Sequence, residues 1–478
     1  MTNAVVVGSG PNGLSAAVRL AQCGVKVRVL ESSSRIGGGT RSSGLTLPGI
    51  IHDDCSAFHP TGVSSPFFRS LDLEGHGLTW LWPEIQLAHP LESGSAGVLW
   101  RDIEQTAEHM GQDGRAWLQI FGELSAKFDE LAAEVFRPML HVPGHPIALG
   151  RFGATAAKPA SWTVRKWKRP ETQALFGGVA AHAFTRLDVP LSSSVGTMLT
   201  AAAHAYGWPV AKGGSSAITN ALANVLYSLG GTIETNSRVE SLAELGSPDV
   251  VMLSVAPDQA AKICRGHLPR RVLRAFERYR YGPAAYKVDL VIDGEIPWIN
   301  EECRRAGTVH LGGTFEETAE AERQVVRGRM PRRPFTLVGQ QYLADPSRSV
   351  GNINPIWAYA HVPHNYQGRA EEAVIDRIDS FAPGIRKQIL GVHVRTAPQM
   401  QQYNSNYVGG DISSGSNSGL QIAMRPRIAI DPYRVGIPGV YLCSSATPPG
   451  AGVHGMCGAN AAQSALAYLG IEEANRES

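Results

Sequence analysis

The chain has 478 residues, of which 43% are hydrophobic and 18% are charged. These values are typical of a folded protein with more than one core and exclude extensive disorder. Its 44 basic and 42 acidic residues leave a formal net charge of +2, so the charge balance gives no basis for binding nucleic acid.

A glycine-rich turn lies close to the N-terminus. The pattern of apolar residues predicts a strand over 4–7, a helix over 14–23 and a strand over 25–30. Such a β-α-β unit binds the pyrophosphate of a dinucleotide on its first turn, and an acidic residue after the second strand binds a ribose hydroxyl. The alternative, a turn that binds nothing, does not explain that acid. The candidate cofactor residues are Gly8, Ser9, Gly10, Pro11, Asn12, Gly13, Glu31 and Ser32.

A second glycine cluster follows directly, where a dinucleotide domain would normally begin its next helix. Gly38 and Gly39 offer backbone N–H groups without side-chain obstruction, and Arg35 and Arg41 can face a phosphate. Thr40 belongs to the same candidate site. The alternative interpretation is a mobile loop with solvated arginines.

The middle of the chain shows no further dinucleotide feature. Helical patterns such as 117–135 predominate up to about residue 200, and a helix over 217–229 precedes predicted strands over 232–239 and 250–255. Val239, in the first of these strands, is a further candidate cofactor contact. Beyond residue 285 the sequence predicts strands over 286–292, 308–311 and 357–361, and a helix over 371–381.

The last forty residues repeat the order strand, glycine loop and helix. A strand begins at Val440, and a helix runs from Ala459 onward. We expect the start of this helix to stabilise negative charge on a bound ring, with Ser445, Gly455, Met456 and Ala459 as contacts. The alternative is a βα turn that only closes the sheet.

These motifs together resemble the phytoene desaturase group of flavoproteins, which is distantly related to the amine oxidases. Within that group, several segments are similar to the pyridine nucleotide-disulphide oxidoreductase domain 2 type, and the likeness covers nearly the whole chain. The similar segments are 51–60 (IHDDCSAFHP), 207–214 (GWPVAKGG), 281–283 (YGP), 309–313 (VHLGG), 359–363 (YAHVP) and 407–411 (YVGGD). The resemblance implies FAD as the cofactor and hydride transfer to flavin N5, and it leaves the substrate undefined.

The predicted fold is α/β, with a discontinuous Rossmann-type FAD-binding lobe and an inserted α+β substrate lobe. We expect the FAD-binding lobe to comprise residues 1–70, 205–285 and 425–478. The substrate lobe comprises residues 71–204 and 286–424.

Two absences from the sequence refine the cofactor prediction. No second strand-glycine-helix fingerprint is available for NAD(P)H, so oxygen or a quinone-like molecule is the expected electron acceptor. The cysteine arrangement that amine oxidases use for a covalent flavin link is also missing, so Cys443 and Cys457 are expected to be packing residues and FAD to bind non-covalently.

Desaturation also requires a base, and histidine can serve near neutral pH. His454 is the candidate catalytic residue because it lies within the C-terminal glycine loop, and His52, His59 and His361 are weaker candidates. Each of them can equally be a structural histidine.

The predicted function is an FAD-dependent dehydrogenase or oxidase that introduces a double bond into a small organic, apolar substrate. A redox-neutral flavin isomerase has the same cofactor motifs, and a non-catalytic flavin-binding scaffold is the alternative from another class. The six cysteines form no metal-ligand pattern, which predicts a reduced cytoplasmic protein without a metal. Few residues precede the first strand, so we expect no signal peptide.

A stretch at 158–169 mixes tryptophan with basic residues. This composition suits peripheral contact with a membrane surface, and a solvated face is the commoner explanation. No apolar stretch is long enough to span a bilayer.

Overall fold

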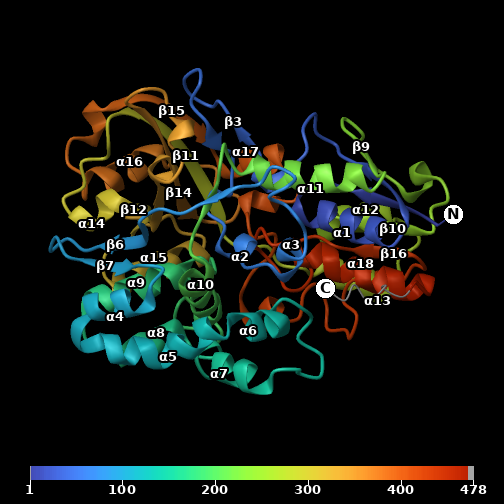
Figure 1. Cartoon of the computed structure of the whole chain (residues 1–478), viewed down its shortest axis with the longest axis horizontal. Coiled ribbons are helices and arrows are strands. Elements are labelled where there is room, and N and C mark those ends of the chain that lie inside the picture. Colours follow the sequence, from blue (N-terminus) through green and yellow to red (C-terminus); the bar gives the residue numbers. More distant parts are fainter. Residues whose placement is uncertain (1, 472–478) are drawn as a thin grey trace.

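The computed structural model describes residues 2–471 and has two lobes, each built on its own sheet (Figure 1). The first lobe contains a five-stranded parallel sheet of order β16-β10-β1-β2-β9. Its strands are β1 (Asn3–Val7), β2 (Lys26–Leu30), β9 (Thr232–Glu234), β10 (Val250–Leu253) and β16 (Val440–Leu442). Because these strands are parallel, their carboxyl ends meet at one edge.

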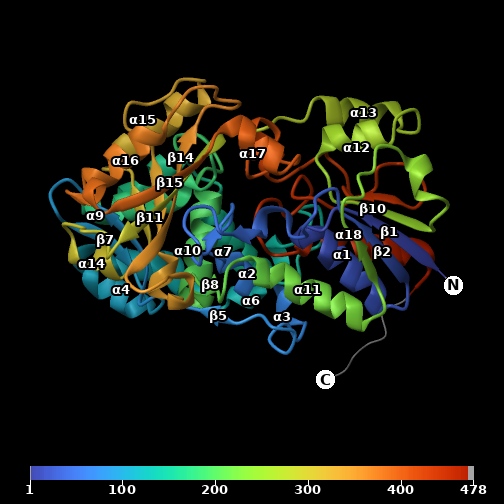
Figure 2. The same ribbon diagram turned by 90° about the horizontal axis from the view of Figure 1, so that it is seen from above.

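Both faces of this sheet are covered, as its continuous apolar strands require. Ala4 and Val6 pack with helices α1 (Pro11–Gln22), α11 (Ser216–Ser228) and α18 (Met456–Leu469) on one face. Val5 and Val7 pack with α12 (Pro257–Ile263) and α13 (Arg270–Glu277) on the other (Figure 2). The alternation of side chains along β1 therefore builds two cores.

The second lobe is built on a seven-stranded sheet of order β15-β11-β14-β13-β12-β6-β7, in which only β12 and β6 are parallel. Helix α16 packs on one face of this sheet, and α9 and α15 pack near the other. Its strands are β6 (Ile85–Pro90), β7 (Ala96–Leu99), β11 (Ala284–Asp293), β12 (Ala306–Leu311), β13 (Thr336–Gly339), β14 (Ile353–Val362) and β15 (Ile389–Arg395).

Further α-helices and two small two-stranded sheets surround these two sheets. The helices are α2 (Pro60–Val63), α3 (Pro66–Arg69), α4 (Ile103–His109), α5 (Gly114–Ala126), α6 (Phe128–Val135), α7 (Pro146–Ala156), α8 (Ala160–Thr163), α9 (Pro170–Ala181), α10 (Ser193–Tyr206), α14 (Glu301–Arg305), α15 (Phe315–Val326), α16 (Glu371–Asp379) and α17 (Ala397–Tyr403). The paired two-residue strands are β3 (Ser42–Ser43) with β4 (His52–Asp53), and β5 (Trp80–Leu81) with β8 (Val210–Ala211).

The architecture confirms the predicted α/β fold class, because the parallel sheet draws its strands from separate parts of the chain and the other lobe carries its own sheet. Two element predictions need correction. The helix expected over 117–135 is two helices, since Lys127 has φ −112° and ψ 35° and breaks the helical path. The strand expected over 232–239 ends at Glu234.

The basic stretch at 158–169 presents less tryptophan to the surface than its sequence suggests. Trp162 is exposed, but Trp167 is fully buried against Trp117 and Phe176. Within residues 2–471, no helix is long and apolar enough to cross a membrane.

Candidate functional site

A cavity of about 630 Å³ lies where the two lobes meet. Its walls come from the carboxyl end of the parallel sheet and from the seven-stranded sheet. The carboxyl edge of a parallel sheet is where dinucleotide ligands bind in open α/β folds, and this volume lies within the range of small-molecule sites.

The turn between β1 and α1 needs glycine for geometric reasons. Gly8 has φ +99°, a left-handed conformation that a side chain disfavours. A β-carbon at Gly13 would lie 2.0 Å from the Gly8 carbonyl oxygen. Gly10 is the N-cap of α1 and no side chain caps that helix, so its first N–H groups are available to a phosphate.

Glu31 lines the cavity, but its carboxylate already has partners within the chain. Oε2 accepts hydrogen bonds from the Ser9 N–H at 2.9 Å and the Ser9 hydroxyl at 2.6 Å. Oε1 accepts from the Ser33 N–H at 2.8 Å and lies 3.4 Å from Nη2 of Arg41. The acid therefore fixes the glycine-rich turn in addition to facing the cavity.

The turn at Gly38–Thr40 packs directly on the first one. The Gly37 N–H donates to the Ser9 carbonyl at 3.1 Å, and a β-carbon at Gly38 would lie 3.0 Å from the Gly10 Cα. Arg41 lines the cavity. The side chain of Arg35 is 56% exposed and pairs with Asp54, so it lies outside the cavity.

The C-terminal glycine loop lines the cavity with residues between 444 and 453, whereas the start of α18 does not line it. Ser445 lines the cavity and accepts a hydrogen bond from the Asn12 side chain at 3.2 Å. A β-carbon at Gly458 would lie 1.7 Å from the Asn12 carbonyl oxygen, so α18 packs closely against α1. Gly455, Met456 and Ala459 lie behind this wall.

His454 also lies behind the wall. Its Nδ1 accepts a hydrogen bond from the Met456 N–H at 3.0 Å, and its ring packs against Phe136. Burial lowers the pKa of His454 to about 4, which keeps the ring neutral and able to cap α18. This placement supports a structural role and gives no contact with the cavity for a base, so the catalytic assignment stays a prediction.

Most of the sequence-predicted cofactor residues are brought together around one cavity, although their chemical roles stay predictions. The residues that line it are Gly8, Ser9, Gly10, Pro11, Asn12, Glu31, Ser32, Gly38, Gly39, Thr40, Arg41, Val239 and Ser445. Those that do not line it are Gly13, Arg35, His454, Gly455, Met456 and Ala459.

Sequence reasoning missed a polar segment over 402–407 that lies across the cofactor turns. The Tyr403 hydroxyl donates to the Gly38 carbonyl at 2.9 Å. The Asn406 amide bonds both the Ser254 carbonyl and the Ala256 N–H. The only signal in the sequence is its run of asparagine, glutamine and tyrosine, which does not indicate where the segment lies.

The far end of the cavity is aromatic. Phe184, Trp208, Trp357 and Tyr359 line it, and Phe184 stacks on the ring of His361 at 3.8 Å. Phe184 has φ +50°, a conformation that is rare for an aromatic residue and marks functional sites when the surroundings impose it.

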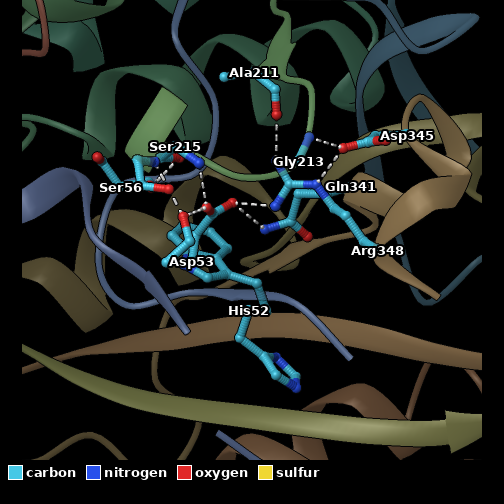
Figure 3. Close-up of polar contacts among 12 residues, drawn as sticks. His52, Asp53, Ser56, Ala211, Gly213, Ser215, Gln341, Asp345 and Arg348 are labelled. Atoms are coloured by element: carbon cyan, nitrogen blue, oxygen red, sulfur yellow. Dashed lines mark hydrogen bonds and ion pairs between the residues drawn. The ribbon is translucent and has the colours of Figure 1, made fainter. Parts of the chain in front are cut away.

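A fully buried ion cluster anchors Asp53, three residues before the cavity-lining Ser56 (Figure 3). Arg348 Nη1 lies 2.6 Å from Asp53 Oδ2, and Arg348 Nε lies 3.0 Å from Asp345. Burial alone would raise the pKa of Asp53, but Arg348 and the Ser215 N–H hold it below its ordinary value. Ser215 in turn donates to the Ser56 carbonyl, which anchors a cavity-lining residue.

Within residues 2–471, no group of three or more histidine, cysteine, aspartate or glutamate side chains is arranged to hold a metal ion. Cys443 and Cys457 are buried, and neither lines the cavity.

Comparison with known proteins agrees with this geometry. Residues 6–72 match the family model described as an NAD(P)-binding Rossmann-like domain. The pyridine nucleotide-disulfide oxidoreductase domain-containing protein 2 of Rattus norvegicus is 23% identical over 96% of this chain and 92% of its own length. The lycopene-forming phytoene desaturase of Pseudescherichia vulneris is 21% identical over 99% and 100%.

Among solved structures, wild-type putrescine oxidase bound to putrescine has a TM-score of 0.61 at 16% identity. The match covers 98% of this chain and 99% of that one. The parallel sheet and the glycine-rich turn show a Rossmann-type dinucleotide-binding lobe. The relatives that span nearly the whole chain identify it as an oxidoreductase. It is homologous to the phytoene desaturase and to the domain 2 proteins over nearly its whole length.

Proposed function

We propose that the protein binds FAD non-covalently and oxidises a small apolar organic molecule by removing a hydride and a proton. The observation that carries the proposal is the continuity of the cavity. The wall of this one cavity includes Glu31 and the start of α1, which no side chain caps. The same cavity extends to Trp357 and Tyr359 of the other lobe.

The residues at the polar end fit a dinucleotide. Gly8, Gly10 and Gly38 form a cradle without side chains, and the α1 N-terminus supplies unpaired N–H groups for a pyrophosphate. Glu31 and Arg41 supply charge at the neighbouring position. The buried Asn12 Oδ1 has no partner among the described residues, so it remains available as an acceptor. FAD, when bound, supplies the two-electron acceptor that this chain lacks.

The aromatic end favours an apolar substrate. Phe184, Trp208, Trp357 and Tyr359 are mostly buried rings that exclude water from the reacting bond. The related phytoene desaturase and putrescine oxidase are named for substrates of different polarity. The support for an apolar substrate is therefore the aromatic lining of the cavity. Oxygen or a quinone-like molecule is the proposed acceptor.

The test begins with the purified protein, which should be yellow and release FAD on denaturation. An anaerobic screen of apolar alkenes, alcohols and amines should then find one that bleaches the flavin absorbance. NADH and NADPH should not bleach the flavin absorbance, and their oxidised forms should not accelerate reoxidation of the reduced flavin. A colourless protein that stays empty when incubated with FAD would overturn the assignment of FAD as the cofactor. Rapid reduction of the flavin by NADH or NADPH would indicate a reductase. Conversion of a substrate without bleaching would indicate an isomerase.

A further inference from the structure

Three histidines, one half-buried and two fully buried, form a line that begins at the aromatic end of the cavity. His182, the residue that ends α9, lines the cavity. Its Nε2 lies 3.0 Å from Nε2 of His310 on β12. His310 and His89 on β6 are fully buried, with ring centroids 6.2 Å apart.

The Nδ1 atoms of the second and third rings both face Gly178 of α9. A β-carbon at Gly178 would lie 2.6 Å from Nδ1 of His89 and 2.6 Å from Nδ1 of His310. Neither Nδ1 has a hydrogen-bond partner among the described residues. Glycine inside a helix such as α9 is unfavourable relative to alanine, and here it leaves room for both nitrogens beside the helix.

A backbone carbonyl sets the direction of the protons along this line. His89 Nε2 lies 2.8 Å from the Gly313 carbonyl oxygen, which can only accept, so the proton of neutral His89 is on Nε2 and its Nδ1 is a lone pair. A proton on Nδ1 of His310 then faces that lone pair, whereas a second lone pair would repel it. This repulsion favours His182 Nε2 as the donor and His310 Nε2 as the acceptor of their 3.0 Å contact.

This order leaves a lone pair on Nδ1 of His182, the ring nitrogen that has no hydrogen-bond partner among the described residues. We propose that His182 Nδ1 is the catalytic base that takes the substrate proton, an inference that rests on the proposed function. The substrate loses a hydride from one atom and a proton from its neighbour, and one π bond forms. The hydride carries both electrons to FAD, and the proton forms an N–H bond at Nδ1 of His182.

The surroundings keep this base neutral before reaction. Burial, and then the nearby His361, lower the pKa of His182 to about 3. His361 on β14 is bonded to Glu322 of α15 at 2.7 Å, so this carboxylate is engaged elsewhere. Thr308 on β12 also lines the cavity.

Chemical modification tests the exposed lone pair without a substrate. Diethyl pyrocarbonate acylates neutral imidazole nitrogen, and mass spectrometry locates the product in the protein as purified. His182 should react equally fast at about pH 7.5 and about pH 5.5. N-acetylhistidine in the same solution should react about tenfold more slowly at the lower pH, because an ordinary imidazole is protonated there. His204, which is also held neutral but is closed by Trp117, should not react. An unreactive His182, or one that loses reactivity at low pH as N-acetylhistidine does, would overturn the proposal.

Histidine tautomers give a second readout. In protein labelled with ¹⁵N-histidine, the signal lost in His182→Gln should be that of a neutral ring protonated on Nε2. A His182 ring protonated on Nδ1 would instead accept from His310 and would have no lone pair on Nδ1, which rules out His182 Nδ1 as the base. Glutamine retains a donor toward His310 but has no nitrogen at the position of Nδ1, so it is the matched substitution.

With a substrate from the anaerobic screen, His182→Gln should slow flavin reduction by roughly 10²–10⁴-fold, the usual contribution of a general base. FAD content should be unchanged, and the exposed His145→Gln should behave as the parent. Reduction at the parental rate in His182→Gln would overturn the base. A protein without FAD would instead overturn the proposed function, while the two preceding readouts would still report the state of Nδ1.

Discussion

Glu31 shows how one side chain can serve both the fold and the ligand. Its carboxylate accepts from the Ser9 N–H and hydroxyl and from the Ser33 N–H, so it holds the glycine-rich turn before any ribose hydroxyl reaches it. The sequence indicated an acid facing the ribose. It could not show the bonds to Ser9 and Ser33, because side-chain partners depend on turn geometry rather than on spacing.

We expect Glu31→Gln to weaken FAD binding by about 1.5–3 kcal/mol, since charge-assisted hydrogen bonds are lost and an amide N–H₂ is placed opposite the Ser9 N–H. Thermal stability should fall as well. Titration of the FAD-free protein with FAD, together with thermal unfolding, measures both effects.

The matched control is Glu234→Gln, because Glu234 lies on the neighbouring strand and forms a half-exposed pair with Arg28. That substitution should change stability by less than about 1 kcal/mol. Equal FAD affinity in the parent and in Glu31→Gln would show that Glu31 does not contribute to FAD binding.

At the scale of elements, the close contact between α1 and α18 depends on the absence of a side chain at Gly458. The Gly458 Cα faces the Asn12 carbonyl so closely that any β-carbon would overlap it. Gly458→Ala should therefore push α18 away from α1, disturb the contact of Asn12 with Ser445, and reduce both stability and FAD retention.

Gly122→Ala in α5 is the matched substitution, because a β-carbon there meets nothing within 4 Å. It should stabilise the protein by roughly 0.5–1 kcal/mol, since helical alanine is favoured over glycine. Thermal unfolding of the two variants should move in opposite directions. A shift of the same sign in both would mean that the close packing of α18 is unimportant.

The buried ion cluster joins elements that are far apart in the sequence. Arg348 donates to Asp53, to Asp345 and to the Ala211 carbonyl, so it connects β4, β8 and the segment after β13. Arg348→Met should destabilise the protein by about 3–5 kcal/mol, because it leaves two buried carboxylates without their cation.

Arg386→Met tests the same chemistry at the surface, where Arg386 pairs with Glu372 and Asp376 in water. Its effect should stay below about 1 kcal/mol. Urea unfolding measures both variants, and a similar small loss in Arg348→Met would show that the cluster does not hold the segments together.

For the molecule as a whole, the sequence indicated the parallel sheet because its strands are short apolar runs next to glycine turns, as in residues 4–13. It could not indicate the seven-stranded sheet order, in which β6 pairs with β12 across more than two hundred residues. It also missed His182, because a histidine after an alanine-rich helix has no motif. Only the folded chain brings it to His310.

The same burial that keeps the histidines neutral makes the whole protein sensitive to acid. Burial lowers the pKa of His52, His59, His89, His204 and His454 to about 4, and that of His182 to about 3. In the unfolded chain each has a pKa near 6.5, so below that pH the unfolded state binds protons that the native state cannot bind. The stabilisation by these neutral rings is complete above pH 6.5 and is lost as the pH falls toward 4.

We therefore expect the free energy of unfolding in urea to fall steeply between pH 6.5 and pH 4. His204→Gln should reduce the slope by about 1.4 kcal/mol per pH unit, because one proton fewer is taken up on unfolding and the glutamine oxygen can still accept from Trp117. The exposed His267→Gln should leave the slope as it is. A parent protein whose stability is flat across this range would show that the buried histidines are protonated in the native state, and the neutral line from His89 to His182 would then be excluded.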